Sequence, residues 1–217
     1  MIKLVIFDYD GLLVESESIA FIAEEKILRR YGKPLSKELF EKYLGYSVKD
    51  TLAGYISHYK LPIMLQEFYK EREQVIFSLL ESDLKLKAGA NVLLTYLRKK
   101  HVDVAIGSSG ERNYIETGLK KLGIQHYFKN ITCVSEVKRG KPFPDLFQEA
   151  LHKNATRPEE AIVLEDAVSG IIAAKKANIF CITVPSQTMD IQDYRIADII
   201  VDDLEKIKNL FERLSIF

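Results

Sequence analysis

Leu4-Val5-Ile6-Phe7-Asp8-Tyr9-Asp10-Gly11 is the stretch from which the fold of this chain can be worked out. Four apolar residues in a row are typical of a strand in a parallel sheet that is covered on both faces. Polar residues follow directly, so this strand ends in side chains that could act in binding or catalysis. In open parallel sheets functional groups gather at the carboxyl ends of the strands. The stretch therefore predicts both a fold class and the place of a site.

Similar apolar runs recur further along the chain, with helical patterns between them. The expected strands are residues 102–106, 131–134, 161–164, 179–184 and 198–201, and the expected helices are residues 89–100, 112–122, 144–153 and 169–177. Strands and helices that alternate in this way form right-handed βαβ units. We therefore expect an α/β fold with an open parallel sheet.

Residues 15–85 break this alternation. They show helical patterns at residues 18–31, 36–43, 48–59 and 64–80 and no convincing strand. The simplest interpretation is an α-helical domain inserted directly after the first strand. The predicted domains are a core of residues 1–14 and 86–217 and a helical insert of residues 15–85.

Composition excludes several classes of protein. The chain has 217 residues, with 31 basic and 31 acidic side chains, and its formal net charge is zero. Nucleic-acid-binding proteins usually carry a basic excess. The first apolar run is too short for a signal peptide or a membrane span. Cys133 and Cys181 lie in apolar stretches, as reduced core thiols do. We expect a cytoplasmic monomer with neither nucleic acid nor a membrane as partner.

Asp8 and Asp10 lie two residues apart, so both carboxylates point to one side of an extended chain. Two carboxylates that close repel each other unless one is protonated or a cation lies nearby. Mg²⁺ prefers oxygen ligands and would remove the conflict. The alternative is that both aspartates only form a turn and a helix cap.

Three later strand ends also carry polar residues. Ser108 and Ser109 precede an expected helix, where hydroxyls and amides can bind an anion. Lys141 lies in a proline-rich loop and could hold a phosphate oxygen. Glu165 and Asp166 follow a buried strand, where carboxylates are costly without a partner. Each has an ordinary alternative: a serine or acid that caps a helix, or a solvated lysine. Together the four ends indicate a metal site, an anion site and a nucleophile.

These residues resemble the four motifs of the haloacid dehalogenase-like superfamily, in order and over essentially the whole chain. Asp8-Tyr9-Asp10-Gly11 is similar to its first motif, and Ser108, Lys141 and Glu165-Asp166 are similar to the other three. The insert resembles the small helical cap of the subfamily that includes phosphoglycolate phosphatase and β-phosphoglucomutase. The resemblance implies a Rossmann-like catalytic core with an α-helical cap.

The resemblance also implies roles for the acidic residues. Asp8 would be the nucleophile that forms an aspartyl-phosphate. Asp10 would be the general acid and then the general base. Mg²⁺ would be bound by Asp8, the backbone carbonyl of Asp10 and Asp166, with Glu165 as a further ligand or just behind the ligands.

For the substrate, the resemblance assigns the phosphoryl oxygens to Ser108, the amide of Ser109 and Lys141. Cap residues of this subfamily close over the leaving group, which makes Tyr46 and Lys49 candidates for substrate specificity. A mixture of tyrosine and lysine suits a small hydroxylated metabolite such as a sugar phosphate; the alternative is that these residues only pack or form solvated surface. The expected partner is therefore a small-molecule phosphate ester.

The type of reaction follows from how this sequence compares with the motifs of its relatives. Dehalogenases of the superfamily typically lack the second aspartate of the first motif, so Asp10 favours a phosphate ester. The mutases carry a threonine and a histidine where this chain has Ser16 and Ala20, and an arginine that residues 45–50 lack. We therefore predict a phosphatase. A β-phosphoglucomutase-like mutase and a catalytically silent ligand-binding protein are the alternatives.

Overall fold

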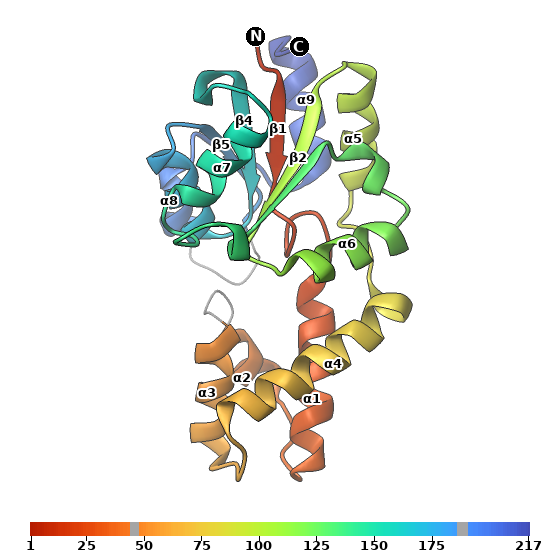
Figure 1. Cartoon of the computed structure of the whole chain (residues 1–217), viewed down its shortest axis with the longest axis vertical. Helices are drawn as coiled ribbons and strands as arrows, with labels where there is room; N and C mark the ends of the chain where they lie inside the picture. Colours follow the sequence, from red (N-terminus) through yellow and green to blue (C-terminus); the bar gives the residue numbers. More distant parts are fainter. Residues whose placement is uncertain (44–47, 186–190) are drawn as a thin grey trace. The chain divides into compact units, whose positions relative to one another are not determined.

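A computed structural model of the chain describes residues 1–43, 48–185 and 191–217 (Figure 1). Contacts between residues divide it into two compact units. The sheet unit comprises Met1–Glu15 and Lys85–Phe217, and the helical unit comprises Ser16–Leu84. Among the described residues, no helix combines the length and the apolar character that a membrane span needs.

A parallel sheet forms the centre of the sheet unit. The strands found in the described residues are β1 (Leu4–Phe7), β2 (Asp103–Ser108), β3 (Asn130–Cys133), β4 (Ala161–Glu165), β5 (Phe180–Thr183) and β6 (Ile199–Ile200). They lie in the order β3-β2-β1-β4-β5-β6, and every neighbouring pair is parallel. The predicted α/β fold with an open parallel sheet is confirmed. Because β1 lies between β2 and β4, the carboxyl ends of these three strands are neighbours.

Helices cover both faces of this sheet. They are α5 (Ala90–Lys99), α6 (Arg112–Lys121), α7 (Asp145–Lys153), α8 (Val168–Lys176) and α9 (Leu204–Leu214), with short 3-10 helices at Gln125–Tyr127, Val134–Glu136, Pro158–Glu160 and Ile191–Ile196. α7 and α8 cover one face, while α5 and α9 pack together on the other side (Figure 1). The Asp203 side chain caps α9 by accepting a hydrogen bond from the Lys206 amide at 2.8 Å.

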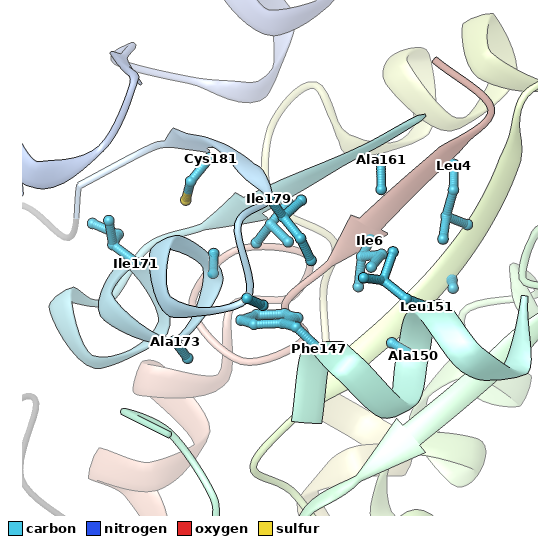
Figure 2. Packing of buried hydrophobic residues seen from close by; sticks show 14 of the residues in the cluster. Leu4, Ile6, Phe147, Ala150, Leu151, Ala161, Ile171, Ala173, Ile179 and Cys181 are labelled. Atoms are coloured by element: carbon cyan, nitrogen blue, oxygen red, sulfur yellow. The ribbon is translucent and has the colours of Figure 1, made fainter. Parts of the chain in front are cut away.

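The core under α7 and α8 fixes the loops that precede these helices. Leu4 and Ile6 point to this face because side chains alternate along a strand. Phe147 of α7 packs against them, together with small residues that let the helices approach the sheet closely (Figure 2). Burying one large apolar side chain of this kind stabilises the fold by about 1.5–3 kcal/mol. The loops after β3 and β4 are thereby held at the carboxyl edge of the sheet.

The helical unit contains α1 (Ser16–Arg30), α2 (Lys37–Glu41), α3 (Val48–Tyr59) and α4 (Leu65–Asp83). α4 packs against both α1 and α3. Between the helices, the buried carboxylate of Glu24 accepts hydrogen bonds from Arg72 Nε at 2.8 Å and from the Tyr55 hydroxyl at 3.0 Å. Burial raises the pKa of Glu24, and Arg72 opposes that shift.

Candidate functional site

The site is built where β1 and β4 end side by side. Phe7 pairs with Leu164, and the amide of Asp8 donates to the Leu164 carbonyl at 2.9 Å. The next side chains of the two strands therefore leave the sheet at the same edge. Carboxylate oxygens of Asp8, Glu165 and Asp166 all lie within 4.8 Å of one another, and all three residues are buried. The structure thus brings these three predicted acids together.

Lys141 joins this group from the loop before α7. Its ammonium donates to the carboxylate of Asp8 and to Glu165 Oε1, the latter at 2.5 Å. The Lys141 side chain is only 6% exposed, so both ion pairs are shielded from water. Burial alone would lower the pKa of Lys141, but Asp8 and Glu165 together raise it above its usual value. The lysine therefore carries its positive charge at neutral pH.

Glu165 is turned inward. Its Oε2 accepts from the amides of Asp166 and Ala167 at 3.1 and 3.2 Å, while Oε1 is bound by Lys141. The carboxylate also lies directly on Gly170 of α8, where an added Cβ would be 1.8 Å from Oε1. Burial raises the pKa of Glu165 to about 7, with Lys141 opposing the shift and Asp8 adding to it. Both oxygens of Glu165 are engaged by the protein itself.

Asp166 is placed differently from its neighbour. A Cβ added to Gly11 would lie 2.1 Å from Asp166 Oδ2, and Gly11 has φ +79°, so both space and conformation require glycine there. This contact ties the loop after β4 to the loop after β1. α8 begins at Val168 and its cap position is Ala167, so Asp166 is not the capping residue. The alternative of a simple helix-capping acid is therefore wrong.

Ser108 and Asp10 meet at Gly110. Ser108 ends β2, is buried, and accepts a hydrogen bond from the Gly110 amide at 3.0 Å through its Oγ. A Cβ at Gly110 would lie 3.3 Å from that Oγ and 3.4 Å from Asp10 Oδ2. Ser109, the next residue, is exposed. The hydroxyl loop after β2 and the loop after β1 are therefore adjacent.

Two contributors to this edge of the sheet were missed by sequence reasoning. Tyr114 of α6 donates from its hydroxyl to Asp10 Oδ1 at 2.7 Å. Gly170 makes room for the Glu165 carboxylate. A signal existed for the first, because Tyr114 falls in the first turn of the helix that follows Ser108. A signal existed for Gly170 as well, because it ends the stretch Leu164-Glu165-Asp166-Ala167-Val168-Ser169-Gly170, but that stretch alone does not show that the glycine makes room for Glu165.

The two specificity candidates belong to the helical unit. Tyr46 lies outside the described residues. Lys49 is exposed near the start of α3.

Comparison with known proteins gives a family match and relatives that agree with it. The family model for haloacid dehalogenase-like hydrolases matches residues 5–184. Validoxylamine A 7'-phosphate phosphatase of Streptomyces hygroscopicus subsp. limoneus is 29% identical over 96% of this chain and 97% of its own. The phosphorylated carbohydrates phosphatase of Thermotoga maritima is 30% identical over 81% of each chain.

A solved structure agrees with these sequence relatives. The HAD family hydrolase from Deinococcus radiodurans R1, solved with bound phosphate and sodium, has a TM-score of 0.80 and 26% identity. The similarity covers 97% of this chain and 96% of that one. Because the family model spans most of the chain and the sheet is open and parallel as predicted, this protein belongs to the haloacid dehalogenase-like hydrolase family.

Proposed function

We propose that this protein is a Mg²⁺-dependent phosphatase that hydrolyses a small phosphorylated metabolite, a sugar phosphate or a related phosphomonoester. The observation that carries the proposal is the buried group of Asp8, Glu165 and Asp166 with the Lys141 ammonium bound to two of them. Relatives over most of the chain are phosphatases, one of them named for phosphorylated carbohydrates.

Asp8 is the proposed nucleophile. One of its carboxylate oxygens forms a bond to phosphorus while the bond from phosphorus to the ester oxygen breaks, which leaves an aspartyl-phosphate. Lys141 lies against the same carboxylate, where it can orient the nucleophile and offset the negative charge of the incoming phosphoryl group.

Asp10 is the proposed proton carrier. In the first step it gives a proton to the departing ester oxygen, so that an alcohol leaves. In the second step it takes a proton from water as the water oxygen attacks phosphorus, which releases inorganic phosphate and restores Asp8. Its place beside Gly110 puts it next to the loop that carries Ser108.

The residues present fit a hard divalent cation. The Lys141 ammonium pairs with Asp8 and Glu165, and Asp166 adds a third buried carboxylate beside them, so a dication would offset negative charge in this group. Asp8 and Asp166 would bind Mg²⁺ together with the backbone carbonyl of Asp10. Glu165 would lie behind them, because Lys141 and two backbone amides already engage its oxygens. Bound Mg²⁺ would stabilise negative charge on the transferring phosphoryl group.

The phosphoryl oxygens would bind Ser108, the amide of Ser109 and Lys141. Ser108 is buried at the end of β2 and Ser109 is exposed directly after it, so a ligand could reach the second residue from solvent. Lys49 remains the proposed specificity residue on the helical unit, together with Tyr46. The cation, the residues that bind the phosphoryl oxygens and the nucleophile would then all act on one phosphate group.

The first experiment measures phosphate release from sugar phosphates, sugar acid phosphates, phosphoglycolate and nucleotides, with Mg²⁺ and then with EDTA. Release that needs the metal and is confined to one or a few esters is expected. Interconversion of sugar phosphates stimulated by a bisphosphate, with little phosphate released, would replace the phosphatase by the mutase. Binding of sugar phosphates without any turnover would favour the silent alternative.

The role of Asp8 is tested by Asp8→Asn, which removes the nucleophilic charge with little change of shape. We expect release to fall to background while the protein stays folded. Asp103→Asn is the matched control, since Asp103 is an exposed carboxylate that pairs with Lys129 where β2 begins. Normal activity of Asp8→Asn would remove the proposed nucleophile.

A further inference from the structure

Tyr114 makes the side-chain hydrogen bond to Asp10 that the sequence motifs do not account for. It lies in the first turn of α6, and its hydroxyl donates to Asp10 Oδ1 at 2.7 Å across 104 residues of sequence. A distance of 2.7 Å between donor and acceptor oxygens is that of a well-formed O–H···O hydrogen bond. The contact therefore restrains the Asp10 carboxylate and does not simply lie near it.

Tyr114 restrains one of the two oxygens of the Asp10 carboxyl group. The Tyr114 hydroxyl binds Oδ1. The other oxygen, Oδ2, lies beside Gly110, 3.4 Å from the position that a Cβ on that glycine would take. Tyr114 Cδ1 lies at the same 3.4 Å from that position. Fixing Oδ1 sets the rotation of the carboxyl group, and thereby the direction in which Oδ2 can give or take a proton.

The tyrosine ring is itself restrained. It packs edge to face against Tyr9, with ring centroids 5.6 Å apart and an interplanar angle of 87°. Tyr9 is fully buried, and its hydroxyl has no hydrogen-bond partner in the part of the chain that the structure describes. Tyr9 therefore acts as a rigid support, and only the Tyr114 hydroxyl of this pair bonds to Asp10 in the described structure.

We infer that Tyr114 is a positioning residue that orients the Asp10 carboxyl group for proton transfer to the leaving group. The inference rests on the proposed phosphatase function. α6 begins directly after the loop of Ser108 and Gly110, so the same segment that would bind the phosphate also aims the proton donor. Tyr114 itself does not touch the reacting atoms in this role.

The test compares Tyr114→Phe with the wild type on two kinds of ester. Alkyl phosphates release a basic alkoxide that needs a proton, whereas p-nitrophenyl phosphate releases a stable phenolate that does not. kcat/KM reports the steps up to loss of the leaving group, so it isolates the acid step from the later attack of water. We expect kcat/KM for alkyl esters to fall about tenfold or more, within the range of general acid catalysis. For p-nitrophenyl phosphate it should change less than about twofold.

Tyr127→Phe is the matched control, because the Tyr127 hydroxyl contacts Thr95 at 3.1 Å and has no part in the proposed chemistry. It should leave both values unchanged. Equal losses on both esters, or no loss on either, would overturn the positioning role. Failure of the proposed function itself looks different, since the wild type would then release phosphate from no ester.

Discussion

Gly170→Ala is expected to destabilise the protein, although the same change in an open helix would stabilise it. The alanine Cβ would lie 1.8 Å from Glu165 Oε1 and 2.4 Å from Oε2. No contact of that length is possible, so the carboxylate has to leave its place. It would lose the bond to Lys141 and the two backbone amides that hold it.

The size of the effect follows from two opposing contributions. Alanine in place of glycine within a helix stabilises by about 1 kcal/mol. Breaking a buried ion pair costs about 3–5 kcal/mol, and Glu165 is fully buried. The net loss is therefore about 2–4 kcal/mol. In a chain of this size each kcal/mol lowers the Tm by about 2–4 °C, so the Tm should fall by about 4–16 °C.

Thermal and urea unfolding of four proteins measures this effect: the wild type, Gly170→Ala, Glu165→Ala and the double variant. Glu165→Ala empties the space that the new methyl group needs. In the Glu165→Ala protein, Gly170→Ala should therefore lower the unfolding free energy only slightly. The effects of the two substitutions on stability should be strongly non-additive. The argument would be refuted if the Gly170→Ala protein were as stable as the wild type. It would also be refuted if Gly170→Ala lowered the unfolding free energy equally in the wild type and in Glu165→Ala.

Three further results are expected. Mg²⁺ at a hundred times its Kd should raise the unfolding free energy by about 2.7 kcal/mol. Asp166→Asn should remove most of the accompanying rise in Tm. An equal rise of Tm in the variant would contradict the proposed metal site. Burial acts to raise the pKa of Glu136, but hydrogen bonds from Lys153 and the Cys133 amide help to lower it to about 2, below an unfolded value of about 4.3. The ionised Glu136 therefore stabilises the fold fully above about pH 5, and this contribution is lost as the pH falls towards 2. The difference in unfolding free energy between wild type and Glu136→Gln should shrink between these pH values and not at higher pH. Burial raises the pKa of Cys133 to about 11, and Cys181 is buried as well, so neither thiol should react with DTNB until urea unfolds the protein.

The fold was predictable where local pattern decides it. The apolar run at residues 4–7 coincides with β1. The pattern predicts that β2 ends at Ile106, yet the strand continues to Ser108 because Gly107 and Ser108 pair with Thr132 and Cys133. Glycine and serine favour loops locally, and only a partner strand more than twenty residues away reverses that preference.

The site was predictable to the same extent. Asp8, Lys141 and the two acids at the end of β4 stand in short motifs, and the order of the strands brings them together. The sequence does not separate Glu165 from Asp166, because their different positions depend on where two glycines lie. The place of Tyr114 in the first turn after Ser108 puts it near this edge of the sheet, but the sequence does not show that its hydroxyl reaches Asp10, because that contact joins residues 104 apart in the chain.

The central place of β1 in the sheet has a consequence for how the protein is made. Leu4 pairs with Asp103 on one side and with Ala161 on the other, so β1 has neither neighbour until about a hundred further residues have been translated. At about 5–20 residues per second that takes roughly 5–20 s. During this time β1, which consists of apolar residues alone and is followed directly by Asp8, has both edges unpaired. On the ribosome, chaperone capture or aggregation should therefore begin at the segment around Asp8.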